Sequence, residues 1–224
     1  MQAPLLPSQD SNWLKTGRWL FAQACTFQKG STKVSNLPME NLDEVAFAGR
    51  SNVGKSSLIN ALTNQKKLAR ISNTPGRTQE INFFDLGDKG GLVDLPGYGY
   101  AQISKEKRLE WSAFVFSFLK GRSKLKRVYV LIDSRHGLKP TDEELFKALD
   151  KSAVSYQIIL TKSDKIKASN RETIVADTQT KLSKFVAAHP VALLTSSEKG
   201  DGIDEVRAEI AALFMPEPRD FPST

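Results

Sequence analysis

The stretch EVAFAGRSNVGKSSLINAL, residues 44–62, decides the fold class of this chain. Its opening residues, EVAFA, predict a buried strand, and its closing residues, SSLINAL, predict a helix. Between them Gly49, Gly54, Lys55 and Ser56 match the pattern G-x-x-x-x-G-K-[ST]. The glycines let the backbone curl so that successive N–H groups point at phosphate oxygens, and the start of the helix adds partial positive charge. The stretch therefore predicts a phosphate-binding loop.

Two side chains of this loop have their own expected roles. Lys55 would reach the β- and γ-phosphates of a nucleotide, and the Ser56 hydroxyl would ligate Mg²⁺. A glycine-rich turn capped by serines is the alternative, which the strand before and the helix after disfavour. The residues predicted to surround the phosphates are Gly49, Arg50, Ser51, Asn52, Val53, Gly54, Lys55, Ser56 and Ser57.

The composition of the chain is that of a soluble protein. Its 224 residues are 40% apolar and 25% charged, and no apolar run approaches the roughly 20 residues that span a bilayer. Cys25 is the single cysteine, which excludes an internal disulfide, and no convincing signal peptide begins the chain. We therefore expect a cytoplasmic protein with no membrane partner. The net charge of +7 indicates either an acidic partner or a lysine-rich surface that binds nothing in particular.

Short apolar runs alternate with helical patterns over residues 26–215, as in a mostly parallel sheet covered on both faces. This pattern predicts a single three-layer α/β domain. Residues 1–25 have no clear period and are interpreted as a loosely held N-terminal extension, and residues 216–224 as a flexible C-terminal tail. The six expected strands are Val45–Ala48, Ile81–Leu86, Gly91–Leu95, Val128–Ile132, Tyr156–Leu160 and Val191–Leu194.

Two segments that follow expected strands have the chemistry to read a guanine base. A carboxylate at Asp164 accepts hydrogen bonds from the guanine N1–H and 2-amino group, and adenine has no donor at either position. Lys162 would lay its aliphatic stem along the base or ribose. The turn after VALL would place a backbone N–H near guanine O6. The predicted base-binding residues are Thr161, Lys162, Ser163, Asp164, Thr195, Ser196 and Ser197.

Two other segments are candidates for sensing the γ-phosphate. In DLPG, residues 94–97, Asp94 would hold Mg²⁺ through a water and the Gly97 N–H would touch the γ-phosphate. In the segment 73–79, a threonine can ligate Mg²⁺ while its N–H meets the same phosphate, and Thr74 and Thr78 both fit by spacing. The next residue after Gly97 is Tyr98, where many such proteins place a glutamine that orients water. We therefore expect slow hydrolysis without help, although a packing role for Tyr98 is equally consistent.

Together these segments resemble the EngB family of ribosome-biogenesis GTPases, in the Era/EngA/TrmE superclass. The resemblance runs from about Phe27 to Leu213 and rests on VAFAGRSNVGKSSLIN, TPGRTQEINFF, VDLPGYGYA, DSRHGLKPTD and TKSDK. It implies a P-loop, Ras-like GTPase domain over residues 26–215 with a six-stranded sheet, and exchange of GTP and GDP with Mg²⁺. It also implies a role in maturation of the large ribosomal subunit and a link to cell division and septation. Our hypothesis for the slow hydrolysis is that a ribosomal particle completes the site and activates it.

The resemblance also implies roles for particular residues. It selects Thr78 as the Mg²⁺ ligand of the segment 73–79, beside Ser56 and Asp94. Relatives with asparagine at the position of Asn52 can bind K⁺ beside the phosphates, so Asn52 is a candidate for K⁺ binding. The alternative is an asparagine that forms a hydrogen bond within its own loop. With this threonine chosen, the candidate catalytic residues are Lys55, Thr78 and Gly97. The remaining candidate residues near the γ-phosphate are Gly76, Arg77, Asp94, Leu95 and Pro96.

The segment 120–127 is rich in lysine and arginine. Lys120, Arg122, Lys124, Lys126 and Arg127 place five cations within eight residues, which fits either a grip on rRNA phosphates or a solvated loop, and the resemblance favours RNA. We expect a monomer. The rivals are a P-loop ATPase or kinase, in which the TKSD carboxylate has no role, and an RNA-binding scaffold with a vestigial nucleotide site.

Overall fold

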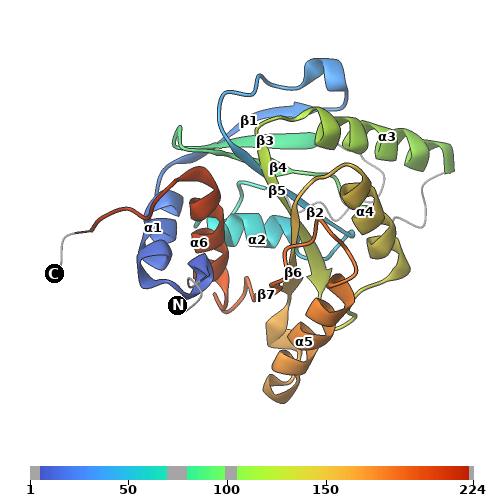
Figure 1. Ribbon diagram of the computed structural model, residues 1–224. Helices are drawn as coiled ribbons and strands as arrows, with labels where there is room; N and C mark the ends of the chain where they lie inside the picture. The colour runs from blue at the N-terminus through green and yellow to red at the C-terminus, as the bar shows by residue number, and fades with distance from the viewer. Residues whose placement is uncertain (1–5, 70–79, 99–104, 222–224) are drawn as a thin grey trace.

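The computed structural model describes residues 6–69, 80–98 and 105–221, with the backbone alone over 105–112. Strand β2 (Glu44–Gly49) lies in the middle of a seven-stranded sheet of order β1-β3-β4-β2-β5-β6-β7. All six residues of β2 are buried, because it has a strand on each side and helices over both faces (Figure 1). The other strands are β1 (Cys25–Ser31), β3 (Ile81–Leu86), β4 (Gly91–Asp94), β5 (Leu125–Asp133), β6 (Tyr156–Thr161) and β7 (Leu193–Leu194).

The sheet is parallel except at one edge. Strand β2 pairs in parallel with β4 and β5, and β5, β6 and β7 continue in the same direction. Strand β3 pairs antiparallel with both β4 and β1. The carboxyl ends of the parallel strands therefore meet along one edge, where the loops of α/β proteins bind their ligands.

Helices cover the two faces, which confirms the three-layer α/β class. The helices are α1 (Ser11–Phe21), α2 (Lys55–Leu62), α3 (Lys105–Gly121), α4 (Pro140–Lys151), α5 (Arg171–Leu182) and α6 (Ile203–Phe214). Successive residues of β2 point to opposite faces: Val45 and Phe47 enter the core under α1, α2 and α6, and Ala46 and Ala48 enter the core under α3, α4 and α5 (Figure 1). Among the described residues, no helix has the length and apolarity to cross a membrane.

The prediction of six strands is wrong by one, because β1 was not recognised. This strand lies at the edge of the sheet, and its residues Thr26, Phe27 and Gln28 are exposed. The pairing with β3 also shifts register between Phe27 and Lys29. An exposed edge strand with a bulge loses the period-two apolar pattern from which strands are predicted.

The interpretation of residues 1–25 as loosely held is also wrong for helix α1. Leu20 and Phe21 are fully buried, and Asp10 caps the helix by accepting the N–H of Asn12 at 2.7 Å. A Cβ on Gly17 would lie 2.6 Å from the backbone of Arg207, so α1 and α6 approach closely only because this residue is glycine. Thr16 and Gly17 belong to the buried face, which hides the apolar stripe that predicts a packed helix.

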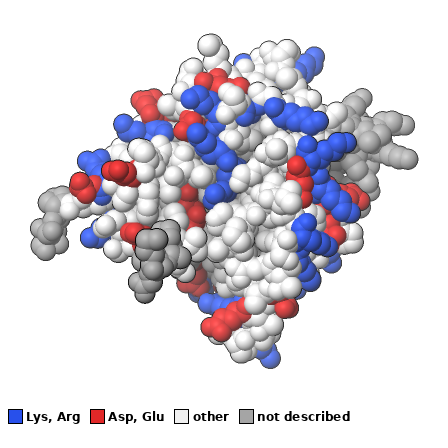
Figure 2. Space-filling view, in the orientation of Figure 1, with Lys and Arg blue, Asp and Glu red and all other residues white. Residues whose placement is uncertain are grey.

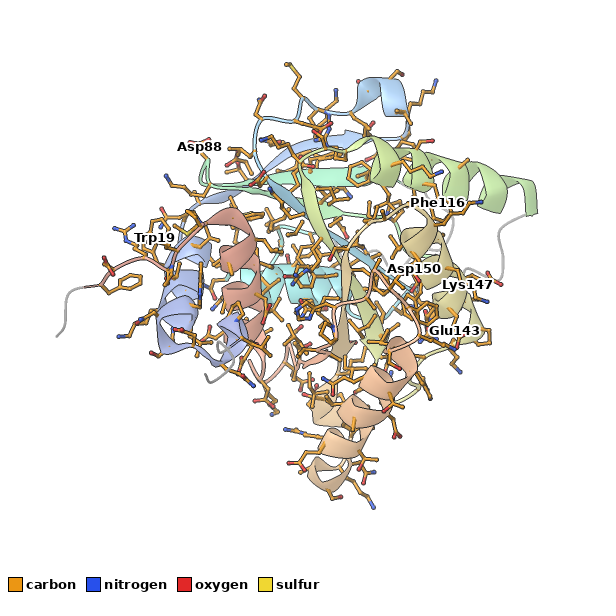
Figure 3. The ribbon with its side chains drawn as sticks, viewed as in Figure 1. Trp19, Asp88, Phe116, Glu143, Lys147 and Asp150 are labelled. Carbon is orange, nitrogen blue, oxygen red and sulfur yellow. The ribbon has the colours of Figure 1, made fainter. Side chains whose placement is uncertain are left out.

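The described part of the C-terminal segment contacts α1. The backbone N–H of Arg219 donates to Thr16 Oγ1 at 2.9 Å, and its guanidinium lies 4.2 Å from the centre of the Trp19 ring. Figure 3 shows Trp19 on the outer side of α1, where the segment passes. Arg219 is therefore held on α1 and does not belong to a free tail, whereas the boundary at residue 216 stays a prediction.

Candidate nucleotide-binding site

The loop between β2 and α2 has the local geometry of a tight phosphate-binding turn. Gly54 caps α2 with φ at 105°, and Asn52 has φ at 63°, so both lie in the left-handed region. The loop closes on itself through the Val53 N–H, which donates to the Arg50 carbonyl at 3.2 Å. A Cβ on Gly49 would lie 2.8 Å from the side chain of Val53, so glycine is required at the end of β2.

Lys55 and Asp94 form an ion pair at the start of α2. Lys55 is the first residue of that helix, and Asp94 is the last residue of β4, beside Phe47 of β2. The lysine ammonium contacts the aspartate carboxylate, and both side chains are nearly buried. Ser56 and Ser57 follow in the first turn of α2. The structure therefore places the predicted phosphate-binding cation and the predicted Mg²⁺-holding carboxylate in direct contact.

The TKSD segment is joined to the phosphate-binding loop by two hydrogen bonds. Thr161, the buried last residue of β6, donates its hydroxyl to the Val53 carbonyl at 2.7 Å. Lys162 donates its ammonium to the Asn52 carbonyl at 2.7 Å and lies 3.0 Å from the Asp133 carboxylate at the end of β5. These contacts span 108 and 110 residues of sequence, so the predicted base-reading segment and the phosphate-binding loop form one unit.

The carboxylate of Asp164 is held by Ser196. The Ser196 hydroxyl donates to Asp164 Oδ1 at 2.7 Å, and this bond, followed by Lys165, keeps the pKa of Asp164 below its ordinary value. Oδ2 is buried, lies 3.0 Å from Lys165 Nζ, and accepts no hydrogen bond from the described residues. A buried, charged oxygen with spare acceptor capacity is what a base with two N–H donors requires.

The turn after β7 contributes differently from the prediction. The N–H of Thr195 donates to the Leu160 carbonyl at 2.7 Å, and that of Ser196 donates to the Asp201 carbonyl at 2.9 Å. These two N–H groups are therefore already bonded, and Ser197 is the remaining candidate for the predicted backbone contact with guanine O6. The Thr195 carbonyl accepts the N–H of Ser163 at 3.0 Å, which fixes this turn to the TKSD segment. The side-chain role of Ser196 was missed because serine in a turn gives no signal of its distant partner.

The segment after Asp94 continues beside the phosphate-binding loop. The N–H of Leu95 donates to the Phe47 carbonyl at 3.0 Å, and that of Tyr98 donates to the Gly49 carbonyl at 3.2 Å. Leu95 and Pro96 are buried. A Cβ on Gly97 would lie 3.2 Å from Ser51 Oγ, so the DLPG backbone lies against the loop.

Tyr98 has a polar partner that sequence analysis missed. Its hydroxyl donates to Asp142 Oδ1 at 2.8 Å, and Asp142 is fully buried in the first turn of α4. Burial, followed by the charge of Asp142, raises the pKa of Tyr98 well above its ordinary value, so the hydroxyl stays protonated. Of the two roles left open for Tyr98, the structure shows a packed, hydrogen-bonded residue.

Several predicted residues cannot be placed. Thr74, Gly76, Arg77 and Thr78 lie outside the described residues, so the roles expected for this segment stay predictions. The described protein donors for Mg²⁺ are the hydroxyl of Ser56 and the carboxylate of Asp94, both of the oxygen type that Mg²⁺ prefers. No cluster of three His, Cys, Asp or Glu occurs among the described residues. This small set fits a Mg²⁺ ion that is held largely by phosphate oxygens and water.

The basic segment is not the five-cation surface that the sequence suggests. Arg122 is buried, forms two hydrogen bonds of 2.6 and 2.8 Å to Glu44, and lies over the Phe83 ring. Arg127 donates to Gln157 at 2.9 Å and is mostly buried. Both arginines hold the fold together, so the prediction that they grip RNA is wrong. The exposed cations of the segment are Lys120, Lys124 and Lys126, and the last two lie 3.8 and 3.2 Å from Asp43.

The fold and the loops at the carboxyl edge of the sheet define a P-loop GTPase. Comparison with known proteins agrees, because the family described as "50S ribosome-binding GTPase" matches residues 44–162. The chain belongs to the EngB family of GTP-binding proteins. A relative from Rhodospirillum rubrum, named "Probable GTP-binding protein EngB", is 52% identical over 91% of this chain and 90% of its own length. A relative from Caulobacter vibrioides with the same name is 55% identical over 91% of this chain and 89% of its own.

Solved structures agree with this assignment. A crystal structure of "a probable GTP-binding protein engB" superposes with a TM-score of 0.59 at 25% identity, over 76% of this chain and 98% of its own. The structure of Era from Aquifex aeolicus bound to GDP.AlF4- also has a TM-score of 0.59, at 22% identity over 81% of this chain and 59% of its own, and shows the shared fold. The chain is accordingly a GTPase.

Proposed function

We propose that this protein cycles between GTP and GDP states at the carboxyl edge of its sheet and acts in assembly of the large ribosomal subunit. The observation that supports nucleotide binding is that side-chain contacts hold three loops together. Thr161 of TKSD bonds to Val53 of the phosphate-binding loop, and Lys55 of that loop contacts Asp94 of DLPG. One bound molecule with a base at one end and phosphates at the other would touch all three.

Guanine specificity is proposed to come from Asp164. Its lowered pKa supports a carboxylate that stays charged at neutral pH, and buried Oδ2 supports recognition of N–H donors. Adenine would bring no N–H donor to this carboxylate and would leave its spare acceptor capacity unused, at a cost of about 1–3 kcal/mol or more for a charged group. Lys162 is fixed across the loop by Asn52 and Asp133, which supports a stem lying along the base or ribose.

Exchange of Asp164 for asparagine tests this assignment. Asp164→Asn presents an amide N–H₂ that donates to the 2-carbonyl of xanthine, so the preference for GDP over XDP is expected to reverse. Competition binding of GDP and XDP measures the change, and Asp177→Asn, an exposed position on α5, is the control. A variant that keeps the parental preference for guanosine would contradict the proposed role.

At the phosphate end, the ion pair would separate as ligands arrive. Lys55 would turn from Asp94 to the β- and γ-phosphates, and Asp94 would hold a Mg²⁺-bound water. Ser56 would coordinate the ion directly, with Thr78 from the segment outside the described residues. The bound Mg²⁺ supplies charge neutralisation on the phosphates. The Gly97 N–H is proposed to touch the γ-phosphate, as supported by the close approach of Gly97 to Ser51.

Hydrolysis by the isolated protein is proposed to be slow. The hydroxyl of Tyr98, which directly follows Gly97, is engaged by Asp142, and an aromatic ring has no amide to orient water. A ribosomal particle, or K⁺ near Asn52, would supply the missing charge, since an added cation is worth about 10³–10⁵-fold in such reactions. Asn52 is exposed at the rim of the loop, which supports access for K⁺. Equal hydrolysis rates in potassium and sodium buffers would exclude the K⁺ route.

The ribosomal role is supported by the family description and by charge. The family that matches residues 44–162 is described as ribosome-binding, and the net charge is +7. Figure 2 shows lysine and arginine side chains on the right of the molecule, around α4, with acidic side chains among them. We propose a cytoplasmic monomer, with its effect on cell division and septation following from ribosome supply.

Co-sedimentation with large ribosomal subunits tests the ribosomal role. Binding should be stronger with a non-hydrolysable GTP analogue than with GDP, and equal binding would refute a GTP-controlled role.

A further inference from the structure

A buried charged cluster joins the phosphate-binding loop, the DLPG segment and helix α4. Its centre is Asp142, whose side chain is fully buried. Asp142 Oδ1 accepts the Tyr98 hydroxyl at 2.8 Å and lies 3.3 Å from Arg50 Nε. The Arg50 guanidinium also donates to the Gly137 carbonyl at 3.2 Å, in the loop that leads from β5 to α4. One carboxylate therefore connects three segments that are far apart in the sequence.

Asp142 also has a local task on its own helix. Its other oxygen, Oδ2, accepts the N–H of Lys139 at 2.8 Å and so caps the start of α4. Burial raises the pKa of Asp142, and the bonds from Lys139 and Tyr98 and the charge of Arg50 oppose that rise. A buried carboxylate without such partners would be costly, so the cluster holds together as a unit.

The backbone beside this cluster fixes the position of Gly97. The N–H of Tyr98 donates to the Gly49 carbonyl at 3.2 Å, and the N–H of Ser51 donates to the Tyr98 carbonyl at 3.1 Å. Tyr98 is thus aligned beside Arg50 in a parallel bridge. Because Gly97 directly precedes Tyr98, an anchor on the Tyr98 side chain also limits the movement of the Gly97 N–H.

We infer that Asp142 is a positioning residue for the GTPase reaction: it anchors Tyr98 against the phosphate-binding loop and so sets the Gly97 N–H for the γ-phosphate. This inference rests on the proposed role of Gly97. It has a selective consequence, because GDP has no γ-phosphate for Gly97 to meet. Loss of the anchor lowers affinity for the triphosphate and leaves affinity for GDP unchanged.

Tyr98→Phe is the primary test, because it removes the hydroxyl and leaves the cap of α4 intact. Affinities of the full chain for GDP and for a non-hydrolysable GTP analogue are measured by calorimetry with Mg²⁺. The analogue is expected to bind about ten-fold more weakly or worse, the value of one hydrogen bond to a charged group, and GDP equally well. Asp142→Asn should act in the same direction, with a lower melting temperature because the cap is also weakened.

Two matched controls separate positioning from stability. Tyr156→Phe removes the hydroxyl of another buried tyrosine, which stacks on Phe146 of α4 and has no hydrogen-bond partner among the described residues. Glu143→Gln neutralises the carboxylate next in sequence to Asp142; Figure 3 shows Glu143 and Lys147 on the outer side of α4. Both controls should leave the ratio of the two affinities unchanged.

A third variant distinguishes the inference from its premise. If Gly97→Ala weakens only the analogue and Tyr98→Phe weakens neither ligand or both equally, the positioning role is wrong and the role of Gly97 survives. Tighter binding of the analogue by Tyr98→Phe also overturns the inference. If Gly97→Ala leaves the analogue's affinity unchanged, the proposed role of Gly97 fails and the inference fails with it.

Discussion

The two ends of the candidate nucleotide site differ in the interactions that a bound ligand would disturb. At the base end, neutral hydroxyls of Thr161 and Ser196 donate to the Val53 carbonyl and to Asp164. At the phosphate end, Lys55 contacts Asp94, and Arg50 lies beside Asp142. The base end also holds the ion pair of Lys162 and Asp133, but a neutral base would not compete for that pair, whereas phosphate and metal would take Lys55 and Asp94 as new partners. We therefore expect the base end to be preformed and the phosphate end to rearrange when ligands bind.

The largest expected effect comes from breaking the ion pair at the phosphate end. Lys55→Ala removes the cation that would stabilise the developing phosphate charge, and it leaves Asp94 buried without its partner. We expect kcat to fall about 100-fold or more, measured as single-turnover release of phosphate. Lys67→Ala, an exposed position just beyond α2, is the control. A Lys55→Ala variant with near-parental hydrolysis would show that this end does not carry the chemistry.

A smaller effect is expected at the base end. Thr161→Val keeps the shape of the side chain and removes the donor to Val53. Affinities for GDP and for the GTP analogue should fall together, by about 5–10-fold, with little change in kcat for bound GTP. Thr178→Val is the matched control, because Thr178 is also buried but its hydroxyl donates within α5, to the Ile174 carbonyl. A loss confined to GTP would mean that the two ends are not separable in the way proposed.

The smallest effect is a contrast in pH dependence between the two buried carboxylates. The pKa of Asp164 is lowered by Ser196, so its stabilising contribution is present above about pH 4 and is lost as the pH falls through its folded pKa. The pKa of Asp142 is raised by burial, so protonation on acidification from neutral pH towards about 4 favours the fold.

Melting curves of the asparagine variants measure this contrast. The difference in Tm between parent and Asp164→Asn should shrink as the pH falls below about 4. The difference between parent and Asp142→Asn should move in favour of the parent as the pH falls from neutral. Parallel pH profiles for the two variants would contradict the opposite shifts.

The sequence by itself determined the parts of this protein that depend on local pattern. The glycines of residues 49–54, the strand before them and the helix after them are read from spacing alone. The alternation of apolar runs and helical patterns likewise gave the α/β class and six of the seven strands. These signals are reliable because backbone conformation at a glycine and the face of a strand are set by neighbouring residues.

Only the tertiary structure decided which side chains meet. Ser196 and Asp164 are 32 residues apart, Tyr98 and Asp142 are 44 apart, and Arg122 and Glu44 are 78 apart. A serine, a tyrosine or an arginine has the same local pattern whether it faces solvent or a buried carboxylate, so no spacing predicts its partner. The local sequence likewise does not predict β1 and α1, because β1 is defined by its pairing with β3 and α1 by its packing on α6. Long-range packing removed two arginines from the predicted RNA surface and gave Tyr98 its anchor, because burying a charge is tolerated only where the fold brings its partner.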